Sequence, residues 1–139
     1  MAKKDCSSVW TDLKTQLMWQ VSLDDEKFVW CEIQKYADTL NKKKYGGFSD
    51  WRVPTRFELE TIQTRRSKKN KLSRKGKLFI KKPLVHSMRF DHQSFWSLSL
   101  AEKEDDGRER AFLVNFFYTK GTMHSGYASY PKHVRCVRC

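Results

Sequence analysis

Lysine and arginine gather in one part of this 139-residue chain, and the chemistry they offer is anion binding. Residues 61–90 contain eleven Lys and Arg residues and no Asp or Glu. Subtracting these eleven charges from the formal net charge of +12 leaves +1 for the rest of the chain. Such a patch favours a polyanion partner, namely a nucleic acid, a sulfated polysaccharide or an anionic membrane. The alternative is a solvated loop without a specific ligand.

The candidate polyanion-binding residues lie in a basic insert at about residues 65–82. They are Arg65, Arg66, Lys68, Lys69, Lys71, Arg74, Lys75, Lys77, Lys81 and Lys82. Apart from Leu78, Phe79 and Ile80 the insert is too polar to form a core element. Phe79 is its one aromatic residue, which argues against base-by-base recognition of single-stranded nucleic acid.

A second group of candidate residues lies towards the C-terminal end. Residues 118–133 are rich in Tyr, Ser, Gly and His, which supply rigid contact area and adaptable hydrogen bonds, as in antibody binding loops. The candidate ligand-face residues are Tyr118, His124, Tyr127, Tyr130 and His133. The alternative is an ordinary solvated hairpin with packed tyrosines.

The four cysteines and four histidines form no recognisable catalytic or metal-binding motif. Cys136 and Cys139 have CxxC spacing, but structural zinc typically takes two such pairs. A thioredoxin-type centre needs the motif at a helix start, whereas this pair follows a predicted strand. We therefore expect no enzyme activity, no catalytic residue, no metal and no cofactor.

The elements that position these residues are predicted from apolar spacing and turn signals. Strands are predicted at residues 9–12, 16–20, 93–100, 111–118 and 133–137. The run at 111–118 is almost continuously apolar, which predicts a central strand covered on both faces. Residues 102–109 predict a hairpin turn. Apolar residues spaced by three and four predict a helix over residues 28–42.

Residues 46–59 predict a rigid corner between this helix and a second one. Gly46 permits a positive φ, and Pro54 fixes its own φ. Thr55 and Glu58 form a capping-box pattern, which predicts a helix from Arg56 to about residue 64. The Arg52 side chain is expected to hydrogen-bond backbone carbonyls. The structural residues we predict are Trp30, Trp51, Arg52, Pro54 and Trp96.

Together these motifs resemble the bacterial domain family typified by the C-terminal domain of the Legionella collagen-like adhesin Lcl. The matching segments are Leu17-Met18-Trp19-Gln20, Gly46-Gly47-Phe48, Asp50-Trp51-Arg52-Val53-Pro54, Phe95-Trp96-Ser97 and Val134-Arg135-Cys136-Val137-Arg138. That family is similar in fold to formylglycine-generating enzymes and C-type lectins. The resemblance implies an α+β fold, with residues 1–139 as a single C-type-lectin-like domain. Two helices would pack on a mainly antiparallel, twisted sheet with paired terminal strands.

The resemblance also implies a non-catalytic ligand-binding module of adhesin or display type. Its ligand would be a polyanion such as a sulfated glycosaminoglycan, or a surface protein. The alternative is an intracellular or phage-related nucleic-acid-binding protein that uses the same insert. The cysteine motif with which formylglycine-generating relatives bind copper is not recognisable here, so that activity does not carry over.

Cysteine pairing departs from the resembled family, whose relatives usually carry a cysteine at the position of Ala37. Pairing of terminal strands implies a bridge from Cys6 to Cys139 or to Cys136, and the alternative is four reduced thiols. No run approaches the roughly 18 apolar residues of a membrane span. The first residues lack a signal peptide's apolar core. The sequence therefore predicts a cytoplasmic chain as it stands, or a cell-surface one if it is a processed fragment.

Overall fold

The fold is a mixture of helices and antiparallel strands. The computed structural model describes residues 8–23, 26–69, 77–85, 88, 94–103, 106–122 and 124–139. The eight strands in these ranges are β1 (Val9–Asp12), β2 (Leu17–Gln20), β3 (Gln63–Lys69), β4 (Lys77–Ile80), β5 (Ser94–Ala101), β6 (Arg110–Asn115), β7 (His124–Tyr127) and β8 (Val137–Arg138). The α-helices are α1 (Ile33–Lys42), α2 (Arg56–Glu60) and α3 (Lys82–Val85), and 3-10 turns lie at Trp30–Glu32 and Tyr45–Gly47. No helix in these ranges is long and apolar enough to cross a membrane.

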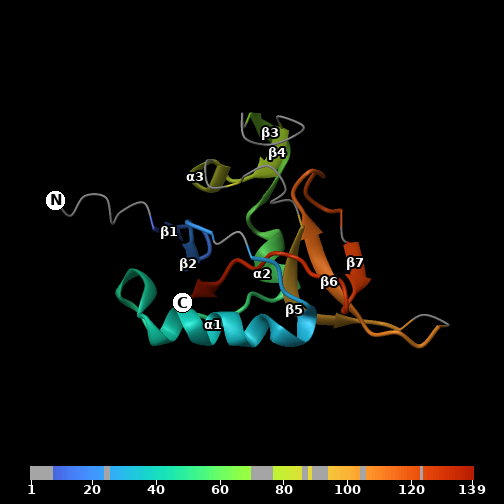
Figure 1. Ribbon diagram of the computed structural model, residues 1–139. Coiled ribbons are helices and arrows are strands. Elements are labelled where there is room, and N and C mark those ends of the chain that lie inside the picture. The colour runs from blue at the N-terminus through green and yellow to red at the C-terminus, as the bar shows by residue number, and fades with distance from the viewer. Residues whose placement is uncertain are drawn as a thin grey trace.

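The strands form three small sheets, where the sequence predicted one. Their orders are β1-β2-β8, β3-β4 and β5-β6-β7, and all the strand pairs are antiparallel. In the first sheet Trp19 of β2 lies opposite Val137 of β8, so the last strand pairs with the second. The terminal strands β1 and β8, which the resemblance implied to be paired, share this sheet but lie on opposite sides of β2. Figure 1 shows α1 along one side of the molecule and the β3–β4 hairpin on the opposite side, with β5 and β6 between them.

The β5-β6-β7 sheet separates two apolar clusters. One contains Leu113 and Trp96 together with the buried face of α1. The other contains Val114 and Phe95 together with buried residues of α2, β4 and α3. Successive residues of a strand point to opposite faces, so neighbouring Leu113 and Val114 belong to different clusters. The C-terminal half of β6 is therefore covered on both faces, as the apolar run predicted.

Helix α1 buries one apolar stripe but begins later than predicted. Its buried residues recur at three- and four-residue spacing and are Ile33, Tyr36, Ala37 and Leu40. Phe28, where the helix was expected to start, instead exchanges two backbone hydrogen bonds with Lys132, at 2.7 and 2.9 Å. That pairing holds the backbone extended, and the chain enters α1 through the 3-10 turn at Trp30–Glu32.

The corner between α1 and α2 is held by Trp51, whose side chain is 2% exposed. Asn41, near the end of α1, accepts a hydrogen bond from the Trp51 backbone N–H at 2.6 Å. The Asn41 amide donates back to the Trp51 carbonyl at 2.9 Å. The Trp51 indole N–H donates to the Tyr45 carbonyl at 2.9 Å. The ring is thereby buried with its polar atom satisfied.

Arg52 contacts a carboxylate, and our prediction that its side chain bonds backbone carbonyls is wrong. Its guanidinium donates to both carboxylate oxygens of Glu58, at 2.7 and 2.8 Å. The same carboxylate accepts the Thr55 backbone N–H at 3.0 Å, and the Thr55 hydroxyl accepts the Glu58 N–H at 3.2 Å. Both halves of the capping box are therefore formed, and Arg52 fixes the side chain that completes it.

Helix α2 is shorter than predicted and ends at Glu60. The Thr61 hydroxyl donates to the Glu58 carbonyl at 2.6 Å. Gln63 then starts β3, where it lies opposite Ile80. Its amide donates to the Tyr118 carbonyl at 2.8 Å, a contact 55 residues away in the chain. These long-range bonds outweigh the local helical pattern.

We expect Trp51→Ala to lower the free energy of unfolding by about 3–5 kcal/mol, because it leaves a large cavity and removes the hydrogen bond from the indole to the Tyr45 carbonyl. Urea denaturation followed by circular dichroism measures this loss. The matched control is Phe57→Ala, since Phe57 is 65% exposed and its removal should cost about 0.5 kcal/mol or less. Equal losses in the two variants would contradict the role assigned to Trp51.

Hydrogen bonds from Arg52 lower the pKa of Glu58 below its ordinary value of 4.5, helped by the Thr55 N–H and opposed by burial. The carboxylate therefore stabilises the fold above pH 4.5, and this contribution is lost as pH falls through the lowered folded pKa. Glu58→Gln should be less stable than the wild type by about 1 kcal/mol at pH 7, because the pair is partly exposed. The difference should shrink as the pH falls from 5 to about 2.

Unfolding curves of both proteins across this pH range test the prediction. Other carboxylates, such as Asp12, titrate in both proteins and cancel in the difference. A difference that stays constant down to the lowest pH would show that the charge of Glu58 does not contribute.

Candidate polyanion-binding surface

The basic insert is built on the β3–β4 hairpin, and β4 anchors that hairpin in the core. Leu78 and Ile80 are fully buried in the cluster that also holds Phe116. The Phe79 N–H donates to the Phe116 carbonyl at 2.7 Å. The three apolar residues singled out in the insert therefore fasten a polar hairpin to the domain.

Nine of the ten predicted basic residues fall into three groups in the structure, and Lys81 stands apart from them. Arg65, Arg66 and Lys82 have exposed side chains. Lys68 and Lys69 lie on β3, and Lys77 begins β4 opposite Lys69. Lys71, Arg74 and Lys75 lie outside the described residues.

Lys81 differs from the other basic residues because it forms a structural ion pair. Its ammonium lies 2.7 Å from a carboxylate oxygen of Asp12, whose side chain is 5% exposed. Burial raises the pKa of Asp12, but hydrogen bonds from Lys81 and from the Lys14 N–H outweigh it and leave the pKa lowered. The carboxylate stays charged and neutralises Lys81. Among the predicted polyanion contacts, Lys81 is therefore one whose charge is already paired within the domain, and its role in binding stays a prediction.

Tyr118 and His124 lie together at the base of the basic hairpin. Their ring centroids are 4.9 Å apart, and Tyr118 is 46% exposed. The next residue, Thr119, donates its hydroxyl hydrogen to the Arg65 carbonyl at 3.2 Å. The Lys120 N–H donates to the Thr64 carbonyl at 2.8 Å. Two regions predicted separately from the sequence thus meet beside β3.

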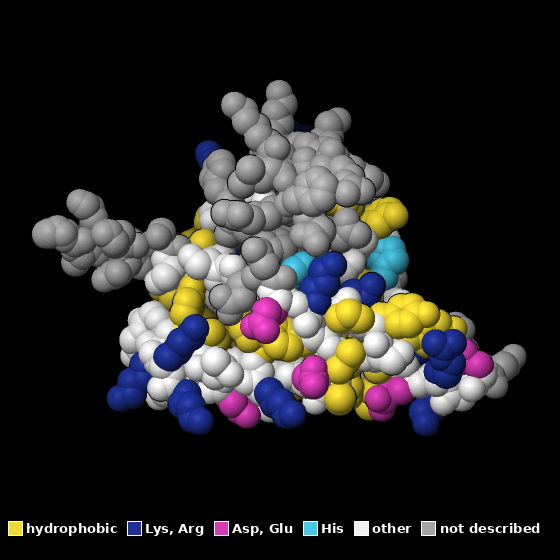
Figure 2. All heavy atoms as spheres, viewed as in Figure 1, with side chains coloured by type: hydrophobic (Ala, Val, Ile, Leu, Met, Phe, Trp, Pro, Cys, Tyr) yellow, Lys and Arg dark blue, Asp and Glu magenta, His cyan; other side chains and the backbone are white. Residues whose placement is uncertain are grey.

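Tyr127 and Tyr130 form a separate aromatic group at the other end of β7. Their rings are 5.7 Å apart in an edge-to-face arrangement. The guanidinium groups of Arg108 and Arg110 lie over the Tyr127 ring, at 3.9 and 4.6 Å from its centroid. Figure 2 shows hydrophobic side chains beside basic and acidic ones on the side of the molecule where β5 and β6 meet.

His133 is only 3% exposed, so the prediction that it belongs to a ligand-binding face is wrong. Its ring packs 5.8 Å from that of Phe95, and its carbonyl accepts the Trp96 N–H at 3.0 Å. A bridge between Phe95 and His133 draws this segment against β5. His133 is thus part of the core.

The remaining predicted structural residues tie β5 to the loops around it. The indole of Trp30 donates to the Ser97 carbonyl at 2.9 Å, and that of Trp96 donates to the Phe28 carbonyl at 2.8 Å. The Pro54 carbonyl accepts the Leu98 N–H at 2.7 Å.

Cys31, Cys136 and Cys139 carry free thiols. Cys136 is fully buried, and burial raises the pKa of its thiol. The structure thus shows neither Cys136 nor Cys139 in a bridge. Cys6 lies outside the described residues, and its pairing with either of them is a prediction that a thiol count would test.

Sequence reasoning missed Lys120, Arg108 and Arg110 as neighbours of the candidate aromatic residues. From the sequence, Arg108 and Arg110 fall in and beside a turn. Arg110 lies opposite Tyr127 only because of the register in which β6 pairs with β7. The available signal was the alternation of basic residues at the start of an apolar strand, opposite a tyrosine-rich strand.

Lys81→Met should destabilise the protein by about 1–3 kcal/mol, because the Asp12 carboxylate would lose its charged partner. Lys82→Met is the matched control, since Lys82 is exposed, and its effect should be within about 0.5 kcal/mol. Thermal or urea unfolding gives both values. If Lys81→Met weakened polyanion binding and left stability unchanged, Lys81 would be a ligand contact after all.

The sequence was compared with curated proteins and with models of known families. A search of curated proteins finds no match. The family model described as the Lcl C-terminal domain matches residues 8–138, which includes both predicted helices, the basic hairpin and the tyrosine-rich segment. With nearly the whole sequence matched, the chain belongs to the Lcl C-terminal domain family.

Proposed function

We propose that this domain is a non-catalytic recognition module that binds a polyanion, in the manner of an adhesin or display protein. The observation that carries the proposal is the position of Tyr118 and His124 beside β3, at the base of the basic hairpin. This position places the exposed aromatic ring of Tyr118 next to the cationic surface of the hairpin. A sulfated glycosaminoglycan is the ligand class we favour.

The charge distribution supports a ligand with many negative groups. Eleven basic residues and no acidic ones lie between residues 61 and 90. The one described carboxylate paired with this segment is that of Asp12, which takes up Lys81 alone. Of the basic residues of this segment whose side chains the structure describes, Arg65, Arg66 and Lys82 are exposed, where their charges can steer a polyanion and release its counterions on binding.

Tyr118 gives specific support to a second candidate, a single-stranded nucleic acid. The insert itself contains one aromatic residue, but the fold adds the Tyr118–His124 pair to its edge. Nucleobases stack on exposed aromatic rings beside basic grooves, at about 1–3 kcal/mol per base. The two ligand classes therefore differ in how much they depend on Tyr118.

We further propose that the domain has the C-type-lectin-like architecture that its sequence resembles. The pairing of β8 with β2, which joins the two ends of the described chain, supports this assignment. So does the link from α1 through the Trp51 corner to α2.

Binding to heparin and to a single-stranded oligonucleotide, measured by fluorescence anisotropy across a salt series, tests the function. The variant Arg65, Arg66, Lys68 and Lys69→Gln removes four charges from β3. We expect the slope of log K against log salt to become shallower by about 3, at roughly 0.7–0.9 for each lost contact. Desulfated heparin should bind weakly at all salt concentrations.

The matched control removes four exposed charges from α1 and the turn after it, as Lys35, Lys42, Lys43 and Lys44→Gln. It should leave the slope unchanged. An equal loss in both variants would reduce binding to generic electrostatics and refute the site. Tyr118→Ala should weaken oligonucleotide binding at least fivefold if the ligand is nucleic acid, with little change for heparin.

A further inference from the structure

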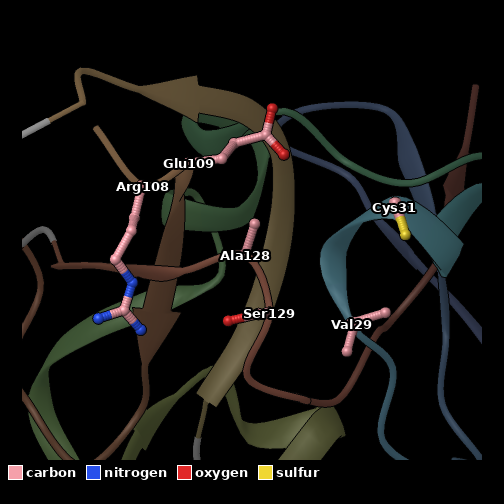
Figure 3. A pocket seen from close by; sticks show the side chains of 6 residues that line it. All are labelled: Val29, Cys31, Arg108, Glu109, Ala128 and Ser129. Atoms are coloured by element: carbon pink, nitrogen blue, oxygen red, sulfur yellow. The ribbon is translucent and has the colours of Figure 1, made fainter. Parts of the chain in front are cut away.

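A pocket of about 440 Å³ lies on a different part of the molecule from the basic hairpin. Its lining residues come from the segment before α1, the start of β6 and the turn after β7, and are Val29, Cys31, Arg108, Glu109, Ala128 and Ser129 (Figure 3). Pockets that hold small molecules span about 300–1,000 Å³, so its volume suits such a ligand.

Backbone hydrogen bonds hold the walls of this pocket in place. The Trp30 N–H donates to the Ala128 carbonyl, and the Ala128 N–H donates to the Glu109 carbonyl, both at 2.9 Å. Ala128 therefore joins the wall before α1 to the wall at β6. A pocket that is already formed loses little conformational entropy when a ligand enters.

Arg108 supplies a cation at the edge of the pocket. Its guanidinium lies 3.9 Å from the Tyr127 ring centroid, and Tyr130 packs against that ring. Among the residues that the structure describes, no carboxylate pairs with the Arg108 guanidinium. A guanidinium fixed on an aromatic face keeps its forked donors for a carboxylate, which it binds through two parallel hydrogen bonds.

Glu109 supplies an anion to the same pocket. Figure 3 shows its carboxylate and the Arg108 guanidinium pointing in different directions from adjacent positions of the chain. In the described part of the chain its carboxylate has no ion pair. Arg110 adds a second cation over the Tyr127 ring, and Asp106, whose carboxylate accepts the Tyr127 hydroxyl, adds a second anion. The charges around the pocket are therefore balanced and do not favour a polyanion. The pocket favours a ligand whose own positive and negative groups are separated in space.

The surface between the two charges is small and mostly apolar. Val29 and Ala128 present methyl groups, and Ser129 adds a hydroxyl that can donate or accept a hydrogen bond. A free amino acid carries its ammonium and carboxylate on one carbon and cannot reach two diverging side chains. An extended peptide separates its termini by about 3.3–3.6 Å per residue.

We propose that this pocket binds a short peptide with free termini, about two or three residues long and with small apolar side chains. Arg108 pairs with the terminal carboxylate, and Glu109 pairs with the terminal ammonium. The side chains lie against Val29 and Ala128. This site is independent of the proposed polyanion-binding function.

Trialanine is the probe that tests the proposal, with the full chain as the receptor. Bound trialanine should slow alkylation of the exposed Cys31 thiol, which lines the pocket, and leave the exposed Cys139 unaffected. Mass spectrometry of each peptide fragment measures both rates in one sample. Isothermal calorimetry gives the affinity. No binding at about 10 mM trialanine, or equal protection of Cys139, would overturn the proposal.

Capped peptides and charge variants separate the two contacts. Amidation of the peptide, or Arg108→Gln, should weaken binding at least about tenfold, and so should acetylation, or Glu109→Gln. Arg108→Gln should not weaken the amidated peptide further, because the same contact is already lost. The control Lys103→Gln should bind normally. If neither cap matters, or if free alanine binds as well as trialanine, the proposed arrangement is wrong.

Discussion

Arg52 joins parts of the chain that would otherwise be separate. Its backbone exchanges two hydrogen bonds with Val137, each 2.9 Å long. Val137 in turn lies opposite Trp19 in β2. The Arg52 guanidinium meanwhile holds Glu58, the residue that caps α2. One residue therefore couples the first sheet to the start of a helix, directly after the buried Trp51. The bidentate ion pair between Arg52 and Glu58 is partly shielded from solvent. Its two parallel hydrogen bonds fix the orientation of the Glu58 carboxylate.

The basic residues of this chain perform two different physical tasks. Arg52 and Lys81 have carboxylate partners, and Arg135 lies fully buried, where it donates hydrogen bonds to the Gln20 and Val21 carbonyls. Burial lowers the pKa of Arg135 to about 9, which still leaves it charged at neutral pH. Arg65 and Arg66 on β3 instead carry their charges on exposed side chains. The net charge of +12 counts both groups alike, although only the second group enters the proposed polyanion-binding function.

Patterns local in sequence predicted structure well, because their physical causes are local. The strand pair at residues 9–12 and 16–20 and the capping box of Thr55 and Glu58 depend on contacts a few residues apart. Failures arose where distant contacts decided the outcome. Gln63 leaves the helical pattern to bond residue 118, and His133 is drawn into the core by its bridge to Phe95. Residue type alone could not separate Lys81 from Lys82, since Asp12 lies 69 residues away from Lys81.

The candidate binding features were predicted as residue types, but their grouping required the fold. Thr119, the neighbour of Tyr118, contacts Arg65 of β3, which lies 54 residues earlier in the chain. Tyr127 lies only nine positions after Tyr118, yet it belongs to the other aromatic group, with Arg108 and Arg110. The tyrosine-rich segment therefore serves two surfaces of different charge. Beside the hairpin lie the exposed Arg65 and Arg66, which fit the polyanion we propose. Beside Arg108 and Glu109 the charge is balanced, which suits a ligand that carries both signs.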